Sequence, residues 1–189
     1  MAGTKQRILE VARELFAEQG VQKTSMREIA DRLGITKPAL YYHFSSREDL
    51  VRSIVQPLIE GGERRLVRYE SARRMDPREL LEDHFDFHYQ HRFDLVLVLN
   101  EITTLADLGL VEKVMAWRER LTVLLTGPSP SLAQATRAVV ALGGLQDCAI
   151  QFRHLPADEL RGPAVDAACA ALGIEKIPPP ENRTGIPVV

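Results

Sequence analysis

The chain has 189 residues and a mass of 21.2 kDa, enough for one large or two small domains whose core needs no disulfide or metal to fold. Hydrophobic residues make up 45% and charged residues 26% of the sequence, which excludes collagenous, low-complexity and largely disordered classes. The longest apolar stretch, residues 138–145, is too short to cross a bilayer, and the first ten residues lack the apolar segment of a signal peptide. We therefore expect a cytoplasmic protein with no membrane partner.

Positive charge is concentrated at the N-terminal end of the chain. Residues 1–47 carry eight Lys and Arg against five Asp and Glu, whereas the whole chain has a formal net charge of −2. A pI near 6.2 therefore does not exclude a polyanionic partner. The two cysteines, Cys148 and Cys169, are too few and too isolated for a disulfide framework or a zinc site, and no cofactor is expected.

Helical periodicity dominates the sequence, and no stretch alternates convincingly with the period of a strand. We predict a first helix over residues 4–19, a second helix opened by a capping box from Ser25 to Glu28, and a short third helix capped by Thr36. A further capping box, from Ser45 to Glu48, predicts a fourth helix that runs to about residue 71.

The second half of the chain carries similar signals. Asp76 and Pro77 predict the start of a helix that runs to about residue 91, and further helices are expected over 95–105, 111–126 and 131–152. A last helix is expected over about 158–172, where Gly162 and Pro163 either kink it or mark its true start. The proline-rich residues 173–189 favour an extended tail. The sequence thus predicts an all-α protein of about nine helices.

The first three helices, with a tight turn at Gly34, fit a helix-turn-helix. A major groove about 12 Å wide admits one short helix that is presented on its outer face. Leu40 and Phe44 of the third helix are expected to point to the core, which leaves an outward face made of Lys37, Pro38, Ala39, Tyr41, Tyr42 and His43. On such a face a lysine can donate to guanine, small side chains can touch a thymine methyl, and tyrosine or histidine can reach phosphates.

Residues 24–50, TSMREIADRLGITKPALYYHFSSREDL, closely resemble the DNA-binding signature of the TetR (tetracycline repressor) family of transcriptional regulators. The resemblance covers about the first quarter of the chain. It implies contacts with operator DNA by Ser25, Arg27, Thr36, Lys37, Pro38, Ala39, Tyr41, Tyr42, His43 and Arg47. The family often has a small residue at the position of Lys37, so the operator sequence stays open.

The same resemblance implies a helix-turn-helix DNA-binding domain over 1–47, an effector-binding and dimerisation domain over 48–172, and a tail over 173–189. It also implies a homodimer. Small residues on the last two helices would let them pair with their symmetry mates as a four-helix bundle. These are Ala135, Ala138, Val139, Leu142, Gly143, Ala149, Ala164, Ala167, Ala168 and Ala171. Simple burial within one chain is the alternative for them.

Three histidines lie in the middle of the apolar arc of the predicted 77–91 helix. Three interpretations of this stripe stay open: histidines bonded to neighbouring helices, residues of an effector cavity, or a metal site formed by pairs at i and i+4. The candidate residues for an effector pocket are His84, Phe85, His88, His91, Asn100, Trp117, Gln151 and Phe152.

The interpretation that follows is a sequence-specific transcriptional regulator, most simply a repressor that a small-molecule effector releases from a pseudo-palindromic operator. We do not expect an enzyme, because the sequence shows no nucleophile elbow, phosphate loop or spaced set of metal ligands. Two alternatives remain: a DNA-binding architectural protein without an effector, and an all-α enzyme that uses the histidine stripe.

Overall fold

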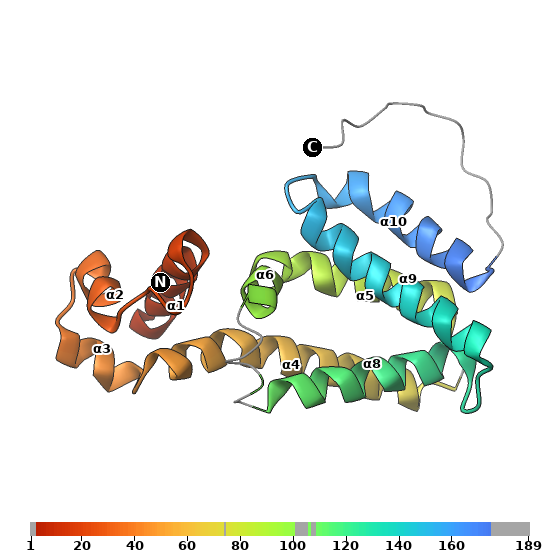
Figure 1. The fold of residues 1–189 in the computed structure, drawn as a ribbon, viewed down its shortest axis with the longest axis horizontal. Coiled ribbons are helices and arrows are strands. Elements are labelled where there is room, and N and C mark those ends of the chain that lie inside the picture. Colours follow the sequence, from red (N-terminus) through yellow and green to blue (C-terminus); the bar gives the residue numbers. More distant parts are fainter. Residues whose placement is uncertain (1–2, 74, 101–105, 107–108, 175–189) are drawn as a thin grey trace.

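Nine helices and no strand make up the described part of the chain, so the all-α prediction is confirmed (Figure 1). The structure is a computed structural model that describes residues 3–73, 75–100, 106 and 109–174. Its helices are α1 (Thr4–Gln19), α2 (Met26–Leu33), α3 (Lys37–His43), α4 (Arg47–Ser71), α5 (Pro77–Gln90), α6 (Arg92–Asn100), α8 (Leu110–Thr126), α9 (Leu132–Gln151) and α10 (Ala157–Leu172). None of these described helices is long and apolar enough to cross a membrane.

The N-terminal helices begin at the predicted caps, except that the cap of α4 lies one residue later than predicted. The Ser25 hydroxyl accepts from the Glu28 amide while the Glu28 carboxylate accepts from the Ser25 amide, so the capping box at α2 is confirmed. The prediction for α4 was one residue early. Ser46 is the N-cap and accepts from the Asp49 amide, and the Asp49 carboxylate accepts from both the amide and the hydroxyl of Ser45.

The later helices keep the predicted order. Pro163 lies inside α10, which begins at Ala157 and continues to Leu172, so Gly162 and Pro163 do not mark its start. The helix predicted over 95–105 is observed as α6 up to Asn100, and its remaining residues 101–105 lie outside the described part, as do residues 175–189 of the predicted tail.

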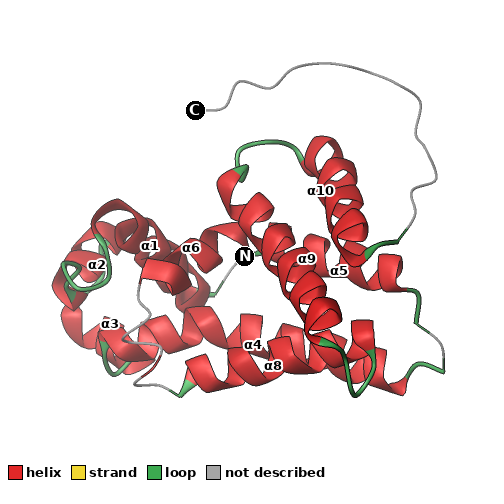
Figure 2. Ribbon diagram, turned by 45° about the vertical axis from the view of Figure 1, so that its right-hand side comes forward, coloured by secondary structure: helices red, strands yellow, loops and turns green. Residues whose placement is uncertain are grey.

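Two hydrophobic clusters hold these helices together. The N-terminal cluster packs α1, α2 and α3 against the first half of α4 and includes Leu97 of α6 and Leu110 of α8. The C-terminal cluster packs α5 against α9 and α10 and includes Leu66 of α4 and Leu121 of α8. Figure 2 shows α9 and α10 running side by side over α5. The domain boundary predicted at residue 47 therefore falls within the N-terminal cluster, because Leu50 of α4 is wholly buried there.

Helix α5 buries the face that its sequence predicts. Four apolar side chains are at most 1% exposed (Leu80, Leu81, Phe85 and Phe87). His84 and His88 lie on the same face and are 8% and 4% exposed. Burial lowers the pKa of His88 to about 4 and holds the pKa of His84 well below its ordinary value, so both imidazoles are neutral at pH 7.

Mild acid is predicted to destabilise the fold through this buried pair. The unfolded chain protonates each histidine near pH 6.5, whereas folded His88 stays neutral down to about pH 4. The unfolded state therefore binds more protons below pH 6.5. The free energy of unfolding is highest above that pH and falls by up to about 1.4 kcal/mol per pH unit and histidine as the pH drops.

Urea unfolding between about pH 5 and pH 7.5 measures this slope. His88→Gln should make the slope shallower by about half, whereas His154→Gln, at an exposed histidine, should leave it unchanged. An equal slope in wild type and His88→Gln would contradict the prediction.

Candidate nucleic-acid interface and cavity

Helix α3 presents an open outer face. Leu40 and Phe44 are 0% and 1% exposed and hold the helix to the N-terminal cluster. On the outer side Tyr42 is 87% and Tyr41 43% exposed, and Lys37, Pro38 and Ala39 are also exposed, while His43 is half-buried. The short helix therefore has the exposure that insertion into a groove requires.

The turn between α2 and α3 fixes the angle of that helix. Gly34 has φ 69°, a left-handed conformation that favours glycine, and its amide donates to Ala30. The Ile35 amide also donates to the Ala30 carbonyl at 3.0 Å. Thr36 then caps α3 by accepting from the Ala39 amide. Local hydrogen bonds thus set the register of every outward side chain on α3.

The three cationic side chains predicted at this surface differ in their exposure and in their contacts within the protein. Lys37 Nζ lies 5.6 Å from the centre of the Tyr41 ring and remains exposed. Arg27 is also exposed, with a loose 3.6 Å ion pair to Asp31. Arg47 instead donates to the Gln22 carbonyl at 2.9 Å and to the Gln22 side chain at 3.1 Å. These bonds give Arg47 a structural part in holding the turn before α2.

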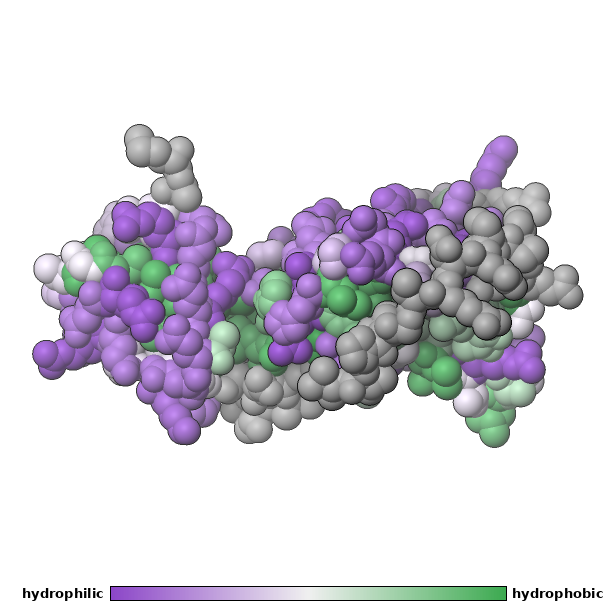
Figure 3. All heavy atoms as spheres, turned by 90° about the horizontal axis from the view of Figure 1, so that it is seen from above, coloured by the Kyte–Doolittle hydropathy of each residue, from purple (hydrophilic) through white to green (hydrophobic). Residues whose placement is uncertain are grey.

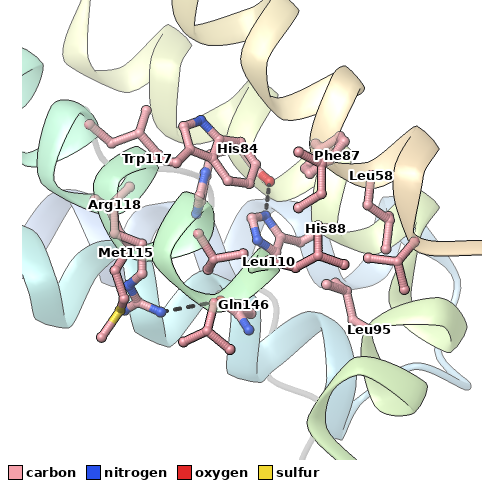
Figure 4. Close-up of a pocket in the computed structure, with 16 residues that line it drawn as sticks. Leu58, His84, Phe87, His88, Leu95, Leu110, Met115, Trp117, Arg118 and Gln146 are labelled. Carbon is pink, nitrogen blue, oxygen red and sulfur yellow. Dashed lines mark hydrogen bonds between the residues drawn. The ribbon is translucent and has the colours of Figure 1, made fainter. Parts of the chain in front are cut away.

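A cavity of about 240 Å³ lies between α4, α5, α6, α8 and α9 (Figure 4). Sixteen described residues line it: Val55, Leu58, Ile59, His84, Phe87, His88, Leu95, Leu110, Val111, Val114, Met115, Trp117, Arg118, Leu121, Leu142 and Gln146. Most of them are apolar, and the polar groups are few, as in sites for small organic molecules.

Only some of the residues predicted for a pocket line this cavity. His84, His88 and Trp117 do. Phe85 does not, because it points into the C-terminal cluster and stacks on Tyr89. His91 caps the end of α5 and packs against the Phe87 ring outside the cavity lining.

The two pocket candidates at the end of α9 lie outside the cavity lining, and the side chain of the candidate at the end of α6 is not among those that the structure describes. Gln151 and Phe152 end α9 on the exposed surface, because α9 faces the cavity only with its middle turns. Asn100 is the last residue of α6, and its side chain lies outside the described part of the structure.

The two buried histidines have fixed hydrogen bonds. His88 Nδ1 lies 2.8 Å from the His84 carbonyl oxygen (Figure 4), and His84 has the backbone of Leu142 as its hydrogen-bond partner. Since a carbonyl only accepts, the Nδ1–H of neutral His88 donates and its Nε2 is left as an acceptor. The described residues include no group of three His, Cys, Asp or Glu arranged to hold a metal ion.

Arg118 and Gln146 are lining residues that the sequence analysis missed. Arg118 Nη1 donates to Gln146 Oε1 at a long 3.4 Å. The signal that could have found Arg118 is its position in the helix. Val111, Val114 and Leu121 lie seven, four and three residues from it, so the arginine interrupts the apolar stripe of α8. Trp117 fits beside it because Gly62 of α4 has no side chain, and a Cβ there would lie 2.3 Å from the indole ring.

The cavity and the N-terminal cluster share residues. Val55 and Leu110 belong to both, and Ile59 and Val111 line the cavity while packing against the cluster. An ion pair of 2.7 Å from Arg13 of α1 to Asp94 of α6 adds a polar contact. The wall of the cavity is therefore continuous with the packing beneath α1–α3.

Residues 8–54 match the family model of the bacterial regulatory proteins, tetR family. Over 84 residues the chain is 37% identical to the transcriptional repressor KstR2 of Rhodococcus jostii (strain RHA1), an alignment that covers 43% of this chain and 39% of the relative. Curated relatives include an activator as well as repressors, and the match spans about two fifths of their length.

Solved structures extend the likeness to most of the chain. A transcriptional regulator from Aquifex aeolicus VF5 is 27% identical with a TM-score of 0.67, covering 87% of this chain and 97% of that chain. AibR, solved with isovaleryl coenzyme A and operator DNA, has a similar fold, with a TM-score of 0.66 and 21% identity over 86% of this chain and 96% of its own. Residues 8–54 therefore carry the DNA-binding signature of the bacterial regulatory proteins of the tetR family, on a chain whose overall fold matches that of solved transcriptional regulators.

Proposed function

We propose that the protein is a sequence-specific, DNA-binding transcriptional repressor that works as a homodimer in the cytoplasm and is released from its operator by a small molecule in the cavity. The observation that carries the proposal is the outer face of α3, where Lys37, Tyr41 and Tyr42 are exposed while Leu40 fixes the helix from beneath. The matched repressor KstR2 and the operator-bound AibR support it.

In this proposal the contacts divide between bases and phosphates. Lys37, Pro38 and Ala39 open α3 and reach base edges, together with Arg27 at the start of α2. Tyr41, Tyr42 and His43 lie further along α3 and hold the phosphate backbone. Ser25 and Thr36 keep their capping bonds and offer their hydroxyl hydrogens to phosphate. Arg47 steadies the turn at Gln22 and adds positive charge at the edge of the surface.

The dimer forms through the exposed faces of α9 and α10. Several of the small residues expected there are buried within one chain (Ala138, Leu142, Ala149, Ala164 and Ala168). The outer faces of both helices remain apolar and exposed, at Leu132 (84%), Val139 (52%) and Val140 (58%) on α9 and at Ala167 on α10. On the face in Figure 3 hydrophilic residues cover most of the N-terminal part, whereas hydrophobic residues show in patches over the C-terminal part.

The effector acts through a coupled equilibrium. It favours one shape of the cavity, and Val55 and Leu110 carry that shape into the N-terminal cluster. The two α3 helices of the dimer then take a spacing that no longer fits the operator, and DNA affinity falls by the difference in effector affinity between the two shapes. An architectural DNA-binding protein would have no use for this cavity, and the matched relatives are regulators rather than enzymes.

Selection of DNA from a pool of random duplexes tests the proposed recognition. The purified protein should enrich a pseudo-palindromic sequence whose half-sites are separated by whole helical turns. Lys37→Ala should weaken binding to that sequence by about 1–3 kcal/mol and relax base preference within each half-site. Lys113→Ala, which removes an equal charge from the exposed side of α8, should have little effect. A pool with no common sequence, or equal losses in the two variants, would count against the proposal.

Sedimentation velocity tests the proposed interface. Val140→Arg places a charge on the exposed apolar face of α9 and should convert the dimer to a monomer, because an unpaired charge is costly to bury. Val67→Arg, at a similarly exposed position on α4, is the matched control and should leave the dimer intact. Dimers that persist in Val140→Arg would refute the proposed interface.

A further inference from the structure

Arg118 is the cation of the cavity, and the described residues do not neutralise it. None of the sixteen lining residues is Asp or Glu. Within the described part of the chain no carboxylate oxygen lies within 4.0 Å of its guanidinium, and its one side-chain hydrogen bond is the 3.4 Å contact with Gln146. By contrast, Arg65 pairs with Asp83 at 3.1 Å and Arg120 pairs with two glutamates.

The neighbouring histidines leave this positive charge uncompensated. His84 and His88 are neutral, and the charges of Arg118 and Arg65 contribute to lowering the pKa of both. Arg65 already has Asp83 as a partner, so Arg118 is the donor-rich group that remains for a ligand. In a site with little water, a guanidinium forms its most favourable hydrogen bonds with an anionic acceptor, and it repels a ligand that carries a positive charge.

The volume of the cavity and its apolar walls limit the size of the ligand and the chemical character of its uncharged part. Its volume is about 240 Å³. A cavity of 150 Å³ holds benzene, so about ten non-hydrogen atoms fit here. The walls around Arg118 are aliphatic or aromatic, including Leu121, Leu142 and Trp117. Met115 is 63% exposed and marks the open side, next to Arg118 in Figure 4.

We infer that the cavity takes a compact organic carboxylate: an aromatic or branched apolar body of about ten non-hydrogen atoms, whose carboxylate pairs with Arg118. This inference rests on the proposed effector site and adds the chemical class of its ligand. His88 Nε2, an acceptor, supplies a second polar contact to ligands that also carry a hydroxyl.

A series of three molecules of similar size tests the charge preference. The probes are 3-phenylpropanoate, its neutral amide and 3-phenylpropylamine. Trp117 is the only tryptophan of the chain and lines the cavity, so its fluorescence reports binding without DNA. The carboxylate should bind at least about tenfold more tightly than the amide, because a charged hydrogen bond is worth about 1.5–3 kcal/mol and tenfold is about 1.4 kcal/mol. The amine should bind most weakly.

Variants of Arg118 separate charge recognition from packing. Arg118→Met keeps a long apolar side chain and should bind the carboxylate and the amide with equal affinity. Arg118→Lys should keep most of the preference. Lys113→Met removes a charge from the exposed side of the same helix and should keep all of it. Thermal melting of each variant confirms that it is folded.

Three results would overturn the inference: equal binding of amide and carboxylate by the wild type, a preference that survives in Arg118→Met, or no binding of any probe. The DNA selection described above is scored separately on the same protein. Operator binding without a carboxylate preference would reject the proposed ligand class and leave the proposed DNA-binding function standing. A carboxylate preference without DNA binding would reject the proposed DNA-binding function and leave the ligand class standing.

Discussion

Helix α4 contributes buried side chains to both hydrophobic clusters. Leu50, Val51 and Ile54 are wholly buried beneath α1–α3, and Leu66 is wholly buried against α5 and α8. At about 1.5 Å per residue its 25 residues span roughly 37 Å. The direction of this helix therefore sets, together with the contacts between α1 and α6, where α3 lies relative to the C-terminal helices, and in the proposed dimer it contributes to the spacing of the two α3 helices.

The middle of α4 is also its least well bonded part. Pro57 lies inside the helix and has no amide hydrogen, so one bond of the helical ladder cannot form. Val55 and Leu58, on either side of it, both line the cavity. The cavity thus meets α4 next to the position where the helix lacks a backbone hydrogen bond, which is where the proposed effector could change the direction of α4 at the lowest cost.

Local signals in the sequence predict the helices and the exposed outer face of α3 well, because caps, glycine turns and apolar stripes act within a few residues. Ser25 and Thr36 cap the predicted helices, and Leu40 is buried as expected. The start of α4 was wrong by one residue because Ser45 and Ser46 are adjacent and both bond to Asp49.

The cavity is harder to predict, since it depends on how five helices meet. His84 and His88 were predicted from their place in the apolar arc of α5, and Trp117 was named as a candidate. Phe85, however, lies about 100° around α5 from His84 and points into the C-terminal cluster. Arg118 was missed because an arginine in a helix is usually a solvated surface charge. Only the place of Arg118 in the apolar stripe of α8 distinguishes it from a surface arginine. That stripe faces a cavity formed by five helices, which the sequence of one helix cannot reveal.

In the proposed function, the coupling between the cavity and DNA binding rests on packing more than on charge. The Arg13–Asp94 ion pair is partly exposed, at 31% and 18%, and such pairs contribute about 0–1 kcal/mol. Leu110 and Val55 are 5% and 1% exposed, and burying one such side chain contributes about 1.5–3 kcal/mol. Because both belong to the cavity wall and to the N-terminal cluster, a ligand that shifts either one changes contacts of that size. Coupling energies of 1–3 kcal/mol change DNA affinity about 5- to 150-fold. Contacts of the size made by the shared apolar residues are therefore large enough for the proposed switch, and the Arg13–Asp94 ion pair could contribute only a smaller part.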